Sequence, residues 1–70
     1  MKKIYFEDRY GERRLIGTRD TDEGVWQVIN NFLAQHKYKA PYVRSWTDDE
    51  GTWYDVGSHS EFFLIKTEAN

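Results

Sequence analysis

The residue types that could recognise a ligand are concentrated in two short segments, 42–46 and 53–60. They contain two tryptophans, two tyrosines, an arginine and an aspartate, followed by a Gly-Ser-His-Ser turn. Trp, Tyr and Arg carry much of the binding energy in protein interfaces. Aromatic rings can also stack on a nucleotide base, and Arg can hold a phosphate. The candidate binding residues are Tyr42, Arg44, Trp46, Trp53, Asp55, Ser58, His59 and Ser60.

These segments are typical of a hairpin around Asp48-Asp49-Glu50-Gly51, an acidic turn that ends in glycine. With residues 48–51 as the loop, Trp46 opposes Trp53, and Arg44 then opposes Asp55. A three-residue loop would instead put Arg44 beside Tyr54 and Val56. In the first register, one face carries Tyr42, Arg44, Trp46, Trp53 and Asp55, and the other carries Val43, Ser45, Tyr54 and Val56. We expect a helix to cover the second face.

The aromatic side of this hairpin has two interpretations. Cross-strand aromatic and charged pairs contribute roughly 0.2–1 kcal/mol each, so the side chains can simply stabilise the sheet. We favour a binding surface, because three large aromatic residues outside a helix-covered core form a patch that needs a partner. Asp48, Asp49 and Glu50 would add an acidic contact loop. The 57–60 turn can also be a local structure in which Ser58 or Ser60 bonds the backbone.

The sequence predicts no enzyme, no metal site and no cofactor. Ser58 or Ser60, His59 and Asp55 are the residue types of a hydrolytic triad, but close neighbours in a strand and turn do not align in the required order. His36 and His59 lack metal-ligand spacing, and we expect His36 to be partly buried at a helix end. The 48–50 acids lack the alternating ligands of a calcium loop. No phosphate-cradling glycine-rich loop precedes a helix.

Composition narrows the class of partner and the compartment. Ten Lys and Arg residues against 12 Asp and Glu leave a net charge of −2, which argues against nucleic acid because a phosphate backbone requires a cationic surface. We expect the pair Arg13-Arg14 to be solvated on a strand edge. The chain has no cysteine and no apolar run near the ~20 residues of a membrane span. We therefore expect a single domain in the cytoplasm, away from membranes.

Hydrophobic spacing predicts the elements that must position these residues. A strand over 2–8 turns at Gly11 into a strand over 12–18, and a helix follows over 21–37. Asp20 is the expected N-cap, with Glu23 completing a capping box. The helix carries an apolar stripe at i, i+3, i+4 and i+7: Val25, Val28, Ile29, Phe32, Leu33 and His36.

Three further strands are expected over 42–47, 52–57 and 61–66. The apolar run 62–65 suits a central strand. The predicted fold is an α+β domain, with one helix packed on a mostly antiparallel four- or five-stranded sheet in the order ββαβββ.

Residues 25–65 resemble small uncharacterised proteins of phages, prophages and mobile elements of Gram-positive bacteria. The most specific part is the string from Tyr54 to Phe63, Tyr-Asp-Val-Gly-Ser-His-Ser-Glu-Phe-Phe. The resemblance implies a phage-type accessory protein that acts by binding, and it carries over no catalytic residue.

Three functions follow as hypotheses. The first is a non-enzymatic protein that inhibits a host or anti-phage defence factor, in the host cytosol, through the aromatic, Arg44 and Asp55 surface. The second is a nucleotide-binding sponge that sequesters a defence signalling molecule, for which a homo-oligomer is expected because pockets can form between subunits. The third is a structural or self-assembling phage accessory protein.

Overall fold

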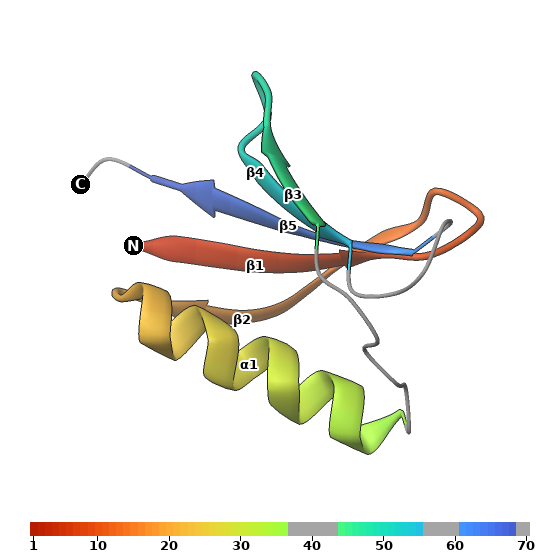
Figure 1. Cartoon of the computed structure of the whole chain (residues 1–70), viewed down its shortest axis with the longest axis horizontal. Coiled ribbons are helices and arrows are strands. Elements are labelled where there is room, and N and C mark those ends of the chain that lie inside the picture. The colour runs from red at the N-terminus through yellow and green to blue at the C-terminus, as the bar shows by residue number, and fades with distance from the viewer. Residues whose placement is uncertain (37–43, 56–60, 69–70) are drawn as a thin grey trace.

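The computed structural model describes residues 1–36, 44–55 and 61–68. Two strands, a helix and three more strands follow one another along the chain, which confirms the predicted order (Figure 1). The elements are β1 (Lys2–Glu7), β2 (Arg13–Arg19), α1 (Asp22–Gln35), β3 (Arg44–Thr47), β4 (Thr52–Asp55) and β5 (Phe62–Thr67). The parts of the predicted strands that fall at 42–43 and 56–57 lie outside the described residues.

The strands form one antiparallel five-stranded sheet in the order β2-β1-β5-β4-β3. The apolar strand β5 is central, as predicted, and it pairs with β1 from Lys2 opposite Thr67 to Glu7 opposite Phe62. β2 and β3 are the two edges. The helix covers one face of the sheet, and the β3–β4 hairpin rises on the other side (Figure 1).

Helix α1 is capped by Thr21, one residue later than predicted. Thr21 has an extended backbone, and its Oγ1 accepts the N–H of Gly24 at 3.0 Å. Glu23 therefore stands one position too early for a capping box, although Asp22 and Glu23 both lie in the first turn, where the helix dipole favours negative charge. The Asp20 cap prediction is wrong, because a Thr next to the first helical turn satisfies the same N–H group.

The core lies between α1 and the sheet, and the predicted helical stripe is buried except at His36. It packs against side chains from β1 and β5: Ile4, Phe6, Phe63 and Ile65. Trp26, at the edge of the stripe, meets the ring of Tyr54 edge-on. His36 is exposed, contrary to the prediction, because it is the C-cap and extends past the end of the packed stripe, with its ring 4.2 Å from that of Phe32.

Candidate binding face

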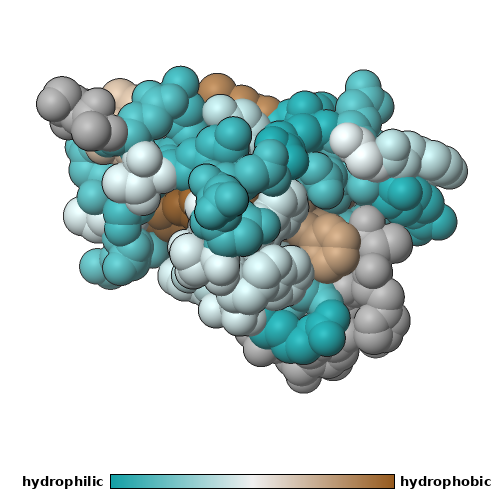
Figure 2. Space-filling view, turned by 90° about the horizontal axis from the view of Figure 1, so that it is seen from above, coloured by the Kyte–Doolittle hydropathy of each residue, from teal (hydrophilic) through white to brown (hydrophobic). Residues whose placement is uncertain are grey.

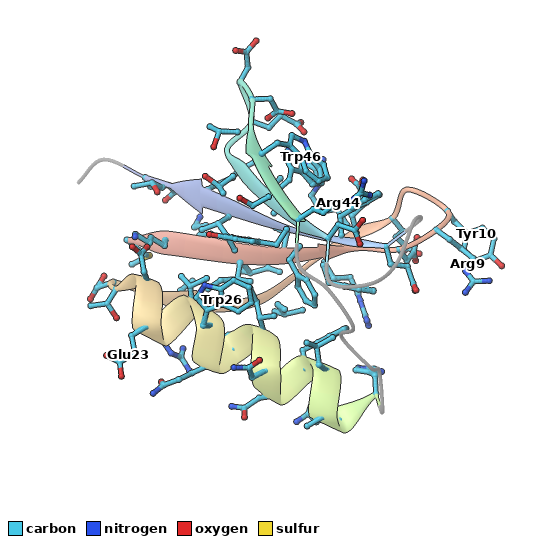
Figure 3. All side chains as sticks on the ribbon, viewed as in Figure 1. Arg9, Tyr10, Glu23, Trp26, Arg44 and Trp46 are labelled. Atoms are coloured by element: carbon cyan, nitrogen blue, oxygen red, sulfur yellow. The ribbon has the colours of Figure 1, made fainter. Side chains whose placement is uncertain are left out.

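The sheet face opposite α1 carries the predicted hairpin residues, and the predicted register is confirmed. Arg44 pairs with Asp55, Trp46 with Trp53, and Thr47 with Thr52. Residues 48–51 form the loop, which is closed by the Asp48 N–H donating to the Gly51 carbonyl at 2.9 Å. Arg44 and Trp46 project away from α1, while Trp26 lies between the sheet and the helix (Figure 3). We call Arg13, Arg44, Trp46, Trp53 and Phe62 on this side the aromatic face.

Trp53 and Trp46 form a stacked pair with unequal exposure. Their ring centres are 6.2 Å apart and the planes differ by 9°. Phe62 of β5 meets both rings edge-on, at 5.7 Å from Trp46 and 6.2 Å from Trp53. Trp53 is only 7% exposed, whereas Trp46 is 41% exposed. Trp53 is thus an interior residue of this face, and of these two rings that of Trp46 is the one exposed to a partner.

Arg44 and Asp55 form a salt bridge that the fold itself uses. The Arg44 Nη2 and Nε groups both donate to Asp55 Oδ2, at 2.5 and 3.2 Å. Asp55 is fully buried, while the Arg44 side chain is 58% exposed. The expectation that Asp55 contacts a partner is therefore corrected, because its buried carboxylate is bonded within the chain and is not accessible at the surface. Arg44 neutralises that buried charge, and removing one partner of a buried pair typically costs several kcal/mol.

The acidic loop is exposed, but two of its three carboxylates, those of Asp48 and Glu50, form contacts within the chain. Asp48 accepts the N–H groups of Glu50 and Gly51, at 2.9 and 3.3 Å, and the indole N–H of Trp53, at 2.9 Å. Partial desolvation opposes the charge of Asp48, but these hydrogen bonds hold its pKa below the usual range. Among the predicted contact acids, Asp49 remains as an exposed carboxylate for which no internal contact is described.

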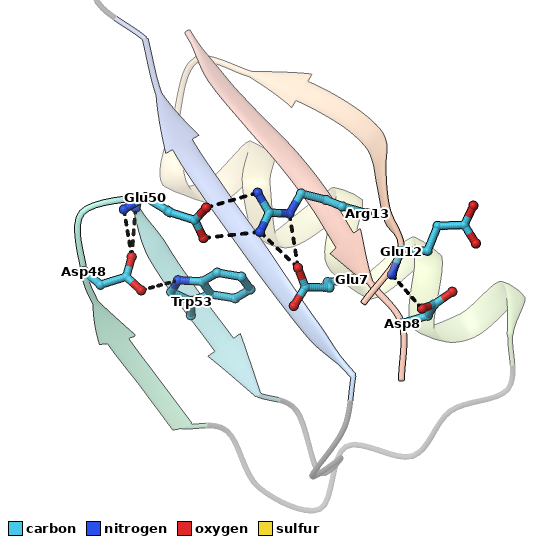
Figure 4. Close-up of polar contacts among 8 residues, drawn as sticks. Glu7, Asp8, Glu12, Arg13, Asp48, Glu50 and Trp53 are labelled. Atoms are coloured by element: carbon cyan, nitrogen blue, oxygen red, sulfur yellow. Dashed lines mark hydrogen bonds and ion pairs between the residues drawn. The ribbon is translucent and has the colours of Figure 1, made fainter. Parts of the chain in front are cut away.

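Arg13 connects the hairpin to the opposite edge of the sheet (Figure 4). Its Nη2 donates to Glu7 on β1 at 3.0 Å and to Glu50 in the hairpin loop at 3.2 Å. Its guanidinium carbon lies 5.5 Å from the centre of the Trp53 ring. The hydrogen bond to Glu7, followed by that to Glu50, raises the pKa of Arg13. A cation and two anions therefore hold the hairpin over the buried Trp53 ring.

The sequence analysis missed this role of Arg13, which it placed in solvent. The contact with Glu7 could have been found, because the 8–12 turn puts Arg13 opposite Glu7 in the hairpin register. The contact with Glu50 spans 37 positions in the sequence, and no local pattern indicates it. The prediction for the neighbouring Arg14 is confirmed, since that residue is exposed.

The aromatic face is less hydrophobic at its surface than its composition suggests. Viewed from the side away from α1, the molecule is mostly hydrophilic, with only small separate hydrophobic areas (Figure 2). The physical reason is that the rings cover one another, and charged side chains cover the rings. Trp46 therefore stands out as an exposed ring within a polar surround.

Four candidate residues, Tyr42, Ser58, His59 and Ser60, lie outside the described residues. Within ranges 1–36, 44–55 and 61–68, no group of three or more His, Asp or Glu side chains is placed to hold a metal ion. No helix in this described part has the length and apolar character needed to cross a membrane.

Comparison of the chain with protein-family models, with curated protein sequences and with solved structures finds no significant match. The resemblance of residues 25–65 to phage proteins therefore stays a prediction.

Proposed function

We propose that this chain is a non-enzymatic binding protein that contacts a partner protein through β3 and the exposed ring of Trp46. The observation that carries the proposal is that Trp46 is both half-exposed and held in place by Trp53 and Phe62. A ring fixed before binding loses little conformational freedom in a complex. Tryptophan is also among the residue types that contribute most to interface affinity.

The backbone of β3 supports the same surface. β3 is an edge strand, and all four of its residues are exposed. Because the Asp48 N–H bonds Gly51 across the hairpin, the alternation of an antiparallel ladder directs the backbone groups of Ser45 and Thr47 outward. An extended segment of a partner could add to this edge as a sixth strand, beside the Trp46 ring.

The proposed class of partner follows from the phage resemblance. A phage-type protein with this surface would inhibit a host or anti-phage defence protein by occupying one of its surfaces in the bacterial cytosol. The overall negative charge of the chain favours a neutral or basic contact region on that partner.

The test compares Trp46→Ala with a matched control, Tyr10→Ala. Tyr10 is an aromatic residue, 87% exposed at the tip of the β1–β2 hairpin (Figure 3). Tagged protein is purified gently from a bacterial host and analysed by native mass spectrometry. A stoichiometric host protein should be lost from Trp46→Ala and retained by Tyr10→Ala, and its retention by both variants would refute the proposed surface. Arg44→Ala is unsuitable here, because it removes the cation that is paired with the buried carboxylate of Asp55.

The nucleotide-sponge hypothesis has weaker support at this face. Two of the five N–H groups of Arg44 bond Asp55, whose negative charge offsets that of the guanidinium, so the pair offers a phosphate little net positive charge. The same mass spectra distinguish the two functions, because a nucleotide would appear as a small added mass lost in Trp46→Ala. A panel of cyclic and ADP-ribose-derived nucleotides that raises the thermal midpoint would favour the sponge.

Self-association is a second candidate function, and the spacing of β3 favours it. Two copies of β3 can pair antiparallel with Ser45 opposite Thr47 of the second copy, which joins the outward backbone groups. In that register Trp46 meets its own counterpart, and Arg44 meets Asp48 of the second copy. Sedimentation should then show a dimer that Ser45→Pro abolishes, since proline removes an outward N–H without disturbing β4. A monomer at all concentrations up to the millimolar range would contradict it.

A further inference from the structure

A concave site lies at the other edge of the sheet, between β2 and α1. It is a groove of about 360 Å³, a volume within the usual range of small-molecule sites. Its floor is apolar and consists of Ile16, Val28 and Phe32. This groove shares no residue with the aromatic face, which belongs to the opposite side of the sheet.

Helix α1 packs closely against β2 near its N-terminal end, and the groove lies between the two elements toward its C-terminal end. A Cβ at Gly17 would lie 3.0 Å from a methyl carbon of Val28, and one at Gly24 would lie 3.0 Å from the side chain of Arg19. The helix therefore approaches β2 closely near these glycines. Since α1 and β2 run in opposite directions, the C-terminal half of α1 lies beside Arg14, which marks the other end of the groove (Figure 1).

The rim of the groove is positively charged, although the whole chain is negative. Arg14 and Arg19 line it, and none of the described residues that line it is a carboxylate. The side chain of Arg14 makes no hydrogen bond or ion pair with any residue in the described ranges, in contrast to that of the adjacent Arg13. Arg19 donates to the carbonyl of Thr18 at 2.7 Å. Because a guanidinium carries five N–H donors, both side chains can still bind an anion.

The polar residues that α1 adds to the rim are Asn31, Gln35 and His36. Their amide and imidazole groups can donate or accept hydrogen bonds, so they suit a ligand with several polar atoms. A peptide strand fits less well than a small ligand. The pairing of β1 with β2 shifts register between Ile4 and Tyr5, and such a bulge interrupts the regular edge that strand addition requires.

We propose that this groove binds a small organic anion, with an apolar or aromatic body on the Ile16, Val28 and Phe32 floor and a phosphate or carboxylate held by Arg14. The positively charged rim favours a ligand with an anionic group, and the apolar floor favours a ligand whose remaining part is apolar. The site is independent of partner binding by Trp46.

Phenyl phosphate is a suitable probe, because it joins a flat ring to a phosphate. A titration of the full chain followed by backbone amide NMR should give saturable shifts at Arg14, Ile16 and Phe32. Arg14→Gln should weaken binding about tenfold, the effect of losing one charge-assisted contact. The control Arg9→Gln, at the hairpin tip, and Trp46→Ala should both leave the affinity unchanged.

Three results would overturn the proposal. The first is the absence of shifts in the groove at millimolar phenyl phosphate. The second is equal affinity for inorganic phosphate, which would mean that the floor contributes nothing. The third is equal affinity for benzyl alcohol, which would mean that the arginines contribute nothing. Retained binding by Arg14→Gln, with a native amide spectrum, would equally refute the role of Arg14.

Discussion

Replacement of Arg13 by methionine tests the contact that holds the β3–β4 hairpin across the sheet. Methionine keeps an apolar stem over Trp53 and removes only the positive charge and its hydrogen bonds. Glu7 and Glu50 would then face each other without the cation between them. We expect the hairpin to dock less firmly and the free energy of unfolding to fall.

The magnitude follows from three partly exposed interactions. Each of the two ion pairs contributes about 0.2–1 kcal/mol, because solvent screens their charges. The cation over Trp53 contributes about 0.5–1 kcal/mol. The expected loss is therefore about 1–3 kcal/mol. In a chain of this length a loss near 2 kcal/mol lowers the thermal midpoint by about 8–16 °C.

The assay is urea unfolding followed by tryptophan fluorescence, with Arg14→Met as the matched control. Arg14 is the next residue on the same strand, and it faces the other side of the sheet without an ion pair to any described residue. Its replacement should change stability by no more than about 0.5 kcal/mol. The difference in the free energy of unfolding between the two variants should be smaller in 1 M NaCl, because salt screens the ion pairs. Equal losses in both variants would refute the bridging role of Arg13.

Three other predictions concern single residues. Thr21→Ala should cost about 1 kcal/mol in thermal unfolding, while Asp20→Ala should be close to neutral, and equal effects would contradict the Thr21 cap. Gly51→Ala should cost more than about 1 kcal/mol by chemical denaturation, because φ is +148° and the new Cβ would lie 2.3 Å from the Ile65 carbonyl oxygen; wild-type stability would show that this packing is wrong. The lowered pKa of Asp48 means that its carboxylate stabilises the fold above about pH 4, and that this contribution is lost as the pH falls through the folded-state pKa. Thermal unfolding midpoints measured from pH 7 to pH 2 should therefore fall less steeply in Asp48→Asn than in the unmodified chain. Parallel curves for the two proteins would contradict this.

Local patterns were sufficient for the elements, and they narrowed the hairpin register to two alternatives, of which the structure has the one with a four-residue loop. The helical stripe from Val25 to Leu33 repeats with the period of a helix, and a stripe of that kind must be buried against something. The four-residue loop 48–51 sets the parity of both flanking strands, so Trp46 opposite Trp53 could be read from the sequence. The apolar run of β5 likewise predicted a central strand, because both of its faces are covered.

The sequence alone therefore determined which side chains share a face, since alternation and turn length are local properties of the chain. Only the tertiary structure decided which of them remain available to a partner. Trp53 is buried and Trp46 is not, because Phe62 and the Arg13 guanidinium, which is itself bonded to Glu50, pack against the ring of Trp53. These contacts join positions far apart in the sequence, so no window of residues records them. Burial depends on such long-range packing, and of the two tryptophans in the predicted surface it leaves Trp46, on the edge strand β3, as the exposed one.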